Sequence, residues 1–135
     1  KSWVAGFVLD SMGRILLVRN LMRNVAAGVP VWEPPGGRMG GDETWQDGVC
    51  REVLEETGIT VYVLANPRVL SGAPRPGAPF RSLILVATAT GDGEPVAGDD
   101  AIEARWFSRR EMPQLSDLAI NSVVRAWVST VPEET

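Results

Sequence analysis

GRMGGDETWQDGVCREVLEETGI, residues 37–59, is the stretch that decides how this chain folds, because it contains the clearest helix signals in the sequence. Thr44, followed three residues later by Asp47, has the spacing of a capping box at a helix N-terminus. Gly58 is the residue type that most often ends a helix. The sequence therefore predicts one helix between Thr44 and Gly58.

An apolar stripe orients this helix. Trp45, Val49 and Val53 recur every fourth residue, so their side chains share one face that we expect to pack on a sheet. Gly48 lies in the middle of the helix, where glycine costs about 1 kcal/mol relative to alanine. That glycine either weakens the helix or indicates close packing at its position.

Three carboxylates share a second face of the same helix. Glu52, Glu55 and Glu56 stand at positions i, i+3 and i+4, although like charges at these spacings repel. Acceptor-only side chains on one spot favour a hard cation, either Mg²⁺ or Mn²⁺. Taken alone, the three residues also fit a solvated acidic surface.

Two further features adjoin the carboxylates. Gly36 and Gly37 follow two prolines, and this turn can bring its backbone close to the same ion. Arg51 directly precedes Glu52 and is open to two interpretations. It either orients a glutamate of the site or makes an ordinary surface ion pair.

The rest of the chain reads as strands, loops and one closing helix. Turn residues 10–13 favour a hairpin between its two flanking strands. The predicted strands span residues 3–9, 15–19, 31–33, 59–64, 82–90 and 103–107. The predicted loops span residues 20–30, 71–79 and 91–100, and the closing helix spans residues 117–130.

This order of elements indicates the fold class. Strands with one helix among them and one at the end predict an α/β (α+β) fold, in which a mixed β-sheet is sandwiched between α-helices. Residues 1–135 have the size of a single domain, and they contain no internal repeat or linker. Because the chain opens on Lys1 and enters a strand at once, we expect a trimmed N-terminus.

Charge and hydropathy limit the partners. Seventeen acidic and thirteen basic residues give a net charge of −4, and no basic cluster stands out, which argues against binding to DNA or RNA. No apolar run approaches the length of a membrane span, so no membrane partner is expected. A small anionic substrate remains compatible if a cation bridges it to the protein.

Cysteine and histidine content limit the chemistry. The single cysteine, Cys50, excludes an internal disulfide and fits a reducing, cytoplasmic location. The chain has no histidine, which excludes a Ser-His-Asp triad and a histidine-ligated zinc site. Carboxylates, cationic side chains, tyrosine or a hard metal ion must therefore carry any reaction.

The stretch of residues 37–59 resembles the signature of the Nudix hydrolase family. That signature, the Nudix box, reads Gly, five residues, Glu, seven residues, then Arg-Glu-aliphatic-any-Glu-Glu-any-Gly-aliphatic. At ordinary residue frequencies such a match arises by chance on the order of 10⁻⁹ per start position. The matching residues are Gly37, Glu43, Arg51, Glu52, Val53, Glu55, Glu56, Gly58 and Ile59.

The resemblance implies a Nudix fold and a set of site residues. Family membership would make Glu55 and Glu56 metal ligands, and Glu52 a ligand or the general base. The carbonyl of Gly36 would be a further ligand, and Glu43 would hold the loop of the box together. With Arg51 as an orienting partner, the expected catalytic residues are Glu52, Glu55, Glu56 and Arg51.

Family members often take another acidic ligand from a later loop, just before a strand that carries a tryptophan. Asp99, Asp100 and Glu103 precede Trp106 here, and we choose Asp100 and Glu103 as the candidates. The chain departs from the common pattern at Gly40-Gly41 and at Gly48, where glutamate and alanine are usual. These departures bear on the flexibility of the loop and remove no expected ligand.

The function implied is Mg²⁺-dependent hydrolysis of a phosphoanhydride bond in a nucleoside diphosphate derivative, such as ADP-ribose, an NDP-sugar or a nucleoside triphosphate. The alternative is a Nudix-fold module that senses a nucleotide without cutting it, although such modules are expected to lose box carboxylates. Two chains could also pair as a homodimer.

A few residues outside the box bear on the substrate. Pro74 lies fifteen residues past Ile59, as in some family members that cleave ADP-ribose, but it belongs to a loop with three prolines. Aromatic rings could stack on a base or simply pack in the core, and arginines could contact phosphate or ribose. The candidate substrate-binding residues are Trp32, Arg75, Phe80 and Arg81.

Overall fold

The computed structural model describes residues 2–20, 25–26, 29–30, 32–64, 68–72 and 82–111. Its strands are β1 (Ser2–Leu9), β2 (Ile15–Asn20), β3 (Val25–Ala26), β4 (Val29–Pro30), β5 (Gly36–Arg38), β6 (Tyr62–Val63), β7 (Arg68–Gly72), β8 (Ser82–Thr90) and β9 (Ala101–Phe107). The described part contains one helix, α1 (Trp45–Thr57). Within that part no helix is long and apolar enough to cross a membrane.

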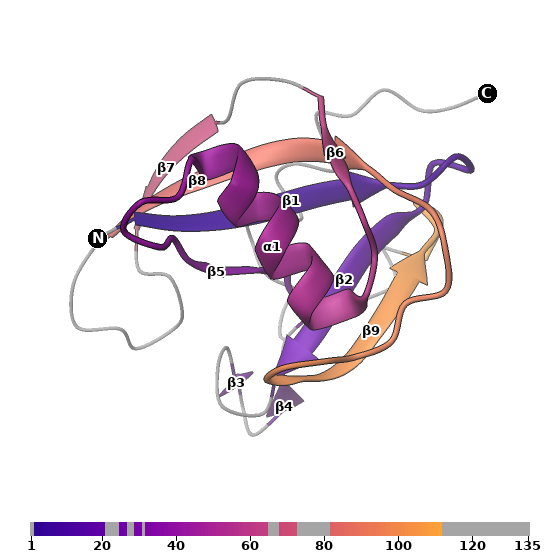
Figure 1. Ribbon diagram of the computed structural model, residues 1–135. Helices are drawn as coiled ribbons and strands as arrows, with labels where there is room; N and C mark the ends of the chain where they lie inside the picture. Colours follow the sequence, from indigo (N-terminus) through magenta and orange to yellow (C-terminus); the bar gives the residue numbers. More distant parts are fainter. Residues whose placement is uncertain are drawn as a thin grey trace.

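A mixed sheet organises the fold (Figure 1). Its strands follow the order β6-β8-β1-β2-β9, with β5 paired to β1 and β7 paired to β8. β1 and β8 run parallel, whereas the other pairs in this sheet are antiparallel. The predicted mixed sheet is confirmed, and β3 and β4 form a separate two-stranded ribbon.

The hairpin between β1 and β2 forms where the turn residues predict it. The Asp10 carboxylate accepts hydrogen bonds from the backbone N–H groups of Met12 and Arg14, at 3.0 and 2.7 Å. It also forms an ion pair with the Arg14 side chain. A short carboxylate that bonds its own turn in this way is typical of an Asx-type turn. The turn carries the chain back into β2 along the sheet.

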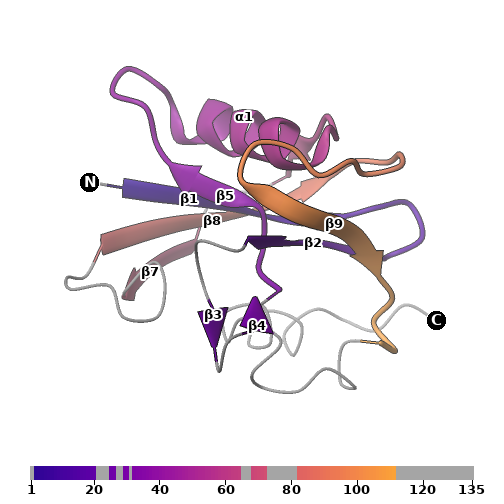
Figure 2. The same ribbon diagram turned by 90° about the horizontal axis from the view of Figure 1, so that it is seen from below.

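α1 begins and ends at the predicted residues. The Thr44 hydroxyl accepts a hydrogen bond of 3.2 Å from the N–H of Asp47, which caps the N-terminus. Gly58 ends the helix in the left-handed conformation, with φ of 72°, and its N–H bonds the carbonyl of Leu54. Figure 2 shows α1 lying across one face of the sheet.

The predicted apolar stripe attaches α1 to this face. Val49 and Val53 are fully buried, and Trp45 packs partly buried against the same core. Gly48 is buried as well, and a Cβ there would approach the Val4 side chain to 3.3 Å. The mid-helix glycine therefore marks close packing of α1 on β1.

Several predicted strands differ in extent from the observed ones. The segment of residues 59–64 forms the short strand Tyr62–Val63, and Ile59 and Val61 before it bury their side chains in the core. Trp32 and Glu33 form an isolated bridge rather than a strand, with Glu33 opposite Val18.

Two predicted loops were partly wrong, and other predicted segments are not described. The loop predicted at residues 20–30 contains Asn20 of β2 and the paired strands β3 and β4. Residues 71–72 belong to β7, which the sequence analysis missed, because pairing with β8 orders them despite the prolines that follow. Strands 3–9, 15–19, 82–90 and 103–107 are confirmed within two residues at each end. The closing helix predicted at residues 117–130 lies outside the described residues.

Candidate active site

Close contact between β5 and α1 forms the floor of the candidate site. Glu52 is buried, with 7% of its surface exposed, and its carboxylate lies directly against the backbone of Gly37. A Cβ at position 37 would overlap that carboxylate, so only glycine leaves room for it. The backbone of Gly36 and Gly37 thus approaches the carboxylates, as the sequence indicated, but from strand β5 rather than from a turn.

Glu56 joins the same two elements more deeply. Its side chain is 1% exposed, and its Oε1 accepts a hydrogen bond of 2.8 Å from the backbone N–H of Gly36. This bond connects the last turn of α1 to the start of β5. Gly36 also pairs with Ala5 of β1, so Glu56 is tied to the centre of the sheet.

Arg51 links several acidic groups around the site. Its Nε and Nη2 donate to the two oxygens of Glu43 at 2.6 and 3.0 Å, in the forked geometry that suits a carboxylate. Its Nη1 donates to Glu55 at 2.9 Å and lies 3.5 Å from Glu52. Its Nη2 also donates to the carbonyl of Arg38. Arg51 therefore contacts two of the three helix carboxylates as well as the loop before the helix.

Glu43 holds that loop in shape. Its Oε1 accepts a hydrogen bond of 2.9 Å from the N–H of Gly40. The hydrogen bond from Arg51, with the Gly40 N–H second, lowers the pKa of Glu43 from 4.5 to about 2. The same pairing raises the pKa of the Arg51 guanidinium. Both groups therefore remain charged at physiological pH, and the ion pair between Arg51 and Glu43, here called the clamp, persists across that range.

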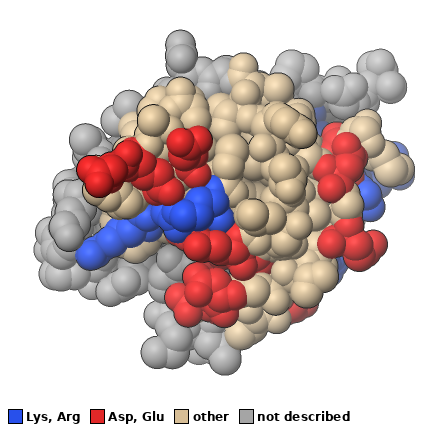
Figure 3. Space-filling view, viewed as in Figure 1, with Lys and Arg blue, Asp and Glu red and all other residues tan. Residues whose placement is uncertain are grey.

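Three carboxylates converge beside this clamp. One oxygen each from Glu52, Glu55 and Asp99 lies within 4.8 Å of the other two. Figure 3 shows basic side chains lying between acidic ones on the face that carries α1. Oxygen ligands from carboxylates are what Mg²⁺ and Mn²⁺ prefer, and this donor set therefore fits such an ion.

The third carboxylate is not one of the two chosen from the sequence. Asp100 is exposed and lies outside this group, and Glu103 forms an ion pair with Arg19, its register partner on β2. Asp99 supplies the carboxylate instead, from a turn residue with φ of +52°. Sequence alone contains no signal that tells Asp99 from its neighbour, because the turn decides which side chain faces α1.

Trp32 does not present a ring for stacking in this structure. Its side chain is 5% exposed, its ring meets Phe107 edge-on at 4.7 Å, and the Arg19 guanidinium lies 4.4 Å from its ring centroid. The prediction of a base-stacking Trp32 is therefore replaced by core packing. The other three substrate-binding candidates, Arg75, Phe80 and Arg81, lie outside the described residues.

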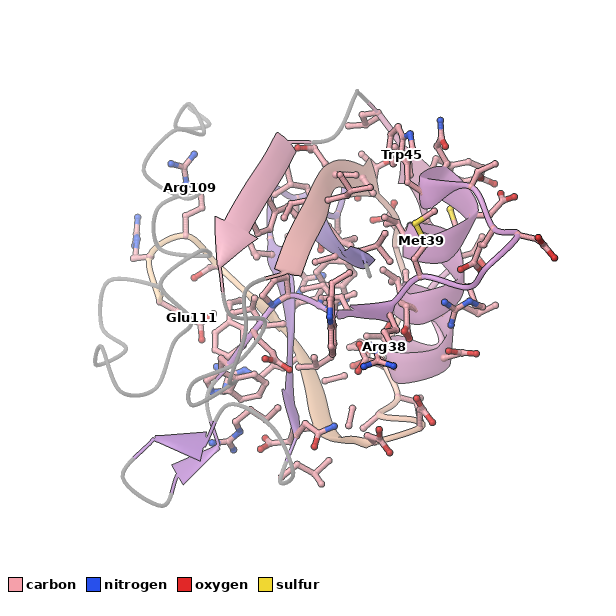
Figure 4. All side chains as sticks on the ribbon, turned by 90° about the vertical axis from the view of Figure 1, so that its left-hand side faces the viewer. Arg38, Met39, Trp45, Arg109 and Glu111 are labelled. Atoms are coloured by element: carbon pink, nitrogen blue, oxygen red, sulfur yellow. The ribbon has the colours of Figure 1, made fainter. Side chains whose placement is uncertain are left out.

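Basic and acidic side chains also lie away from the site. Figure 4 shows Arg38 beside α1, whereas Arg109 and Glu111 lie on the far side of the sheet. Glu111 accepts a hydrogen bond from the N–H of Ser108, which lowers its pKa, and pairs with Arg105. Glu111 and its partners Ser108 and Arg105 stabilise the turn after β9.

Comparison with known proteins supports the resemblance. The sequence profile of the NUDIX domain matches residues 2–128. An ADP-ribose pyrophosphatase from Methanocaldococcus jannaschii is 37% identical over 61% of this chain and 48% of its own length. A putative 8-oxo-dGTP diphosphatase from Bacillus subtilis is 29% identical over 78% of this chain and 65% of its own length. The chain thus spans about half to two thirds of these curated relatives.

Solved structures show the same fold. A MutT NUDIX hydrolase from Burkholderia pseudomallei superposes with a TM-score of 0.75 at 24% identity, over 98% of both chains. A NUDIX family hydrolase from Clostridium perfringens gives a TM-score of 0.76 at 17% identity, over 95% of this chain and 93% of its own. At these identities the superpositions are evidence for the fold alone.

Proposed function

Because the chain belongs to the Nudix family, we propose that it is a divalent-cation-dependent pyrophosphohydrolase acting on a nucleoside diphosphate derivative. The observation that carries this proposal is the convergence of Glu52, Glu55 and Asp99 within 4.8 Å. Two curated relatives bear the names of an ADP-ribose pyrophosphatase and a putative 8-oxo-dGTP diphosphatase. The substrate classes to test first are therefore ADP-ribose, NDP-sugars and nucleoside triphosphates.

The ion proposed for the cluster is Mg²⁺, with Mn²⁺ as the alternative. Glu52, Glu55 and Asp99 would hold it, with Glu56 and the Gly36 carbonyl as the remaining candidates from the motif. When bound, such an ion offsets the negative charge of the phosphates and lowers the pKa of a coordinated water. A chain of net charge −4 with a carboxylate cluster needs this compensation to accept an anionic substrate.

The reaction proposed is attack of water on one phosphorus of the anhydride. A bond forms between the water oxygen and phosphorus, the bond from phosphorus to the bridging oxygen breaks, and the leaving phosphate takes the electron pair. A carboxylate of the site accepts the proton lost by the water, and Glu52 is our candidate for this general base. The products are a nucleoside monophosphate and a second phosphorylated fragment.

The surrounding residues keep the carboxylates in place. The backbone of Gly37 lies against the Glu52 carboxylate and limits its movement toward β5. Arg51 restrains Glu55 through its hydrogen bond of 2.9 Å, and Glu43 restrains Arg51 in turn. Positioning of this kind accounts for a large part of catalysis where the protein supplies little covalent chemistry.

The experiment is a substrate panel with a matched pair of variants. ADP-ribose, several NDP-sugars, dinucleotides and both normal and oxidised nucleoside triphosphates are incubated with the protein and Mg²⁺, and products are separated by chromatography. Glu55→Gln removes one charge from the cluster, whereas Asp47→Asn removes one charge from the exposed first turn of the same helix.

We expect cleavage of at least one class, lost without Mg²⁺ and lowered by about 100-fold or more in Glu55→Gln. Asp47→Asn should retain the wild-type rate. Near-normal turnover in Glu55→Gln would overturn the assignment of the site. Tight nucleotide binding with no cleavage of any substrate would make the protein a sensing module instead.

A further inference from the structure

The loop between β8 and β9, residues 91–100, is tied down at both ends of its path. Near its start, the Asp92 carboxylate accepts hydrogen bonds from the Ser11 N–H and hydroxyl, at 3.0 and 2.8 Å. The indole Nε1 of Trp106 donates a hydrogen bond of 2.7 Å to the carbonyl of Gly93. Trp106 is 8% exposed and packs in the main core, and its bond to Gly93 is partly buried.

The second half of the loop docks on the C-terminal end of α1. The N–H of Val96 donates to the carbonyl of Thr57 at 2.9 Å, and the N–H of Gly98 donates to the carbonyl of Glu56 at 3.0 Å. The last carbonyls of a helix have no partner within it, and the loop supplies two. Figures 1 and 2 both show the segment before β9 passing beside this end of α1.

Gly98 allows the closest approach. A Cβ at this position would lie 2.5 Å from the backbone carbonyl oxygen of Glu55, which is an overlap that cannot be relieved by a side-chain rotation. Any other residue at this position would push the loop away from the helix. Gly98 also accepts a hydrogen bond of 3.0 Å from the N–H of Ala101, which closes the turn that carries Asp99.

Asp99 depends on this docking for its place in the cluster. Its backbone is in the left-handed region, with φ of +52°, which aspartate tolerates better than most residues. Its carboxylate reaches Glu52 and Glu55, although it belongs to a different element. Its direction is therefore determined by the backbone of a turn whose own position depends on Gly98 and Trp106.

From this geometry we propose that Trp106 and Gly98 are positioning residues for the cation site. They hold the 91–100 loop against α1 so that Asp99 completes the carboxylate group, and they thereby determine how tightly the site binds a divalent ion. The inference rests on the proposed function, because it takes Asp99 as a ligand. It differs from a plain core role for Trp106, which phenylalanine could fill without the N–H donor.

The test measures binding of Mn²⁺ alone to the full chain, from the electron paramagnetic resonance signal of the free ion. Trp106→Phe removes the donor to Gly93 and keeps an aromatic ring. Gly98→Ala introduces the overlap with Glu55. We expect each variant to raise the Mn²⁺ dissociation constant by about tenfold, in the range found when groups behind a metal ligand are removed. Asp99→Asn should raise it by at least as much.

Two controls separate positioning from general loss of stability. Phe107→Leu truncates a buried ring on the same strand that makes no bond to the loop, and Gly41→Ala adds a Cβ where nothing lies within 4 Å. Both should leave the Mn²⁺ dissociation constant within about twofold of wild type, even if Phe107→Leu lowers the melting temperature.

A double mutant decides whether Trp106 acts through Asp99. If it does, Asp99→Asn combined with Trp106→Phe binds Mn²⁺ no more weakly than Asp99→Asn alone. Fully additive losses, or an unchanged dissociation constant in Trp106→Phe and Gly98→Ala, would overturn the inference. Failure of the proposed function itself is recognised separately, because Glu55→Gln would then also leave Mn²⁺ binding unchanged.

Discussion

The carboxylate of Glu56 accepts a hydrogen bond of 2.8 Å from the backbone N–H of Gly36, across the contact between α1 and β5. At 1% exposure this glutamate is far more buried than Glu55, whose side chain is 44% exposed. Glutamates that are adjacent in the sequence thus meet different surroundings. Glu56 joins the helix to the sheet, whereas Glu55 belongs to the carboxylate cluster with Glu52 and Asp99.

This difference predicts the stability of two variants. Glu56→Ala leaves the Gly36 N–H without its acceptor and should lower the free energy of unfolding by about 2 kcal/mol. Glu56→Gln keeps an acceptor oxygen and should lose less. Urea unfolding in the presence of EDTA measures both, with Glu55→Ala as the exposed control. Equal losses in Glu56→Ala and Glu55→Ala would show that the bond to Gly36 contributes little.

Gly37 should tolerate no side chain. In Gly37→Ala the new methyl group overlaps the Glu52 carboxylate and must displace it. A displacement near 1 Å costs on the order of 100-fold in rate at a well-positioned site, so kcat/KM should fall by about that factor. Gly41→Ala, in the turn that follows β5 and facing open space, should keep wild-type kinetics. Comparable activity in the two variants would contradict the close packing of Gly37 on Glu52.

Arg51→Lys tests the forked clamp. Lysine keeps the charge but cannot bond both oxygens of Glu43 while also reaching Glu55. We expect kcat to fall by about tenfold or more with a smaller change in KM, because positioning is lost rather than charge. Arg105→Lys, in an exposed ion pair with Glu111, is the matched control. A wild-type kcat in Arg51→Lys would mean that charge alone suffices.

Glu43 predicts an acid-dependent loss of stability. Its pKa in the folded protein is about 2, below the ordinary value of 4.5, so its ionised form is stabilised by folding. That contribution is fully present above pH 4.5 and is lost as the pH falls toward about 2. The difference in unfolding free energy between wild type and Glu43→Gln should therefore shrink over this range. A difference that stays constant between pH 4.5 and about pH 2 would contradict the assignment.

Divalent ions should stabilise the folded protein. Carboxylates that converge within 4.8 Å repel one another, and an ion bound there relieves this repulsion. At a concentration of 100 times its dissociation constant, the ion adds about 2.7 kcal/mol of stability. The melting temperature should therefore rise when Mg²⁺ or Mn²⁺ is added and fall back to its value without the ion when EDTA is added. The rise should be reduced in Glu55→Gln and retained in Asp47→Asn, and equal shifts in both would place the ion elsewhere.

The sequence alone determined the features that depend on neighbouring residues. The Thr44 cap, the Gly58 stop and the apolar stripe of Val49 and Val53 all act within a few residues of one another, so α1 could be placed correctly. The same helical period put Glu52 and Glu55 on one face. Strands with strong apolar character, such as β1 and β8, were also found because their pattern is local.

The tertiary structure decided the features that join distant parts of the chain. β7 forms because β8 pairs with it, and Trp32 is buried because Phe107 and Arg19 lie against it. Asp99, rather than Asp100 or Glu103, reaches the carboxylates because the backbone of the 91–100 loop bonds the last carbonyls of α1. Main-chain groups form such hydrogen bonds whatever their side chains are. The sequence therefore does not show which residue of the turn will have its side chain directed toward the site.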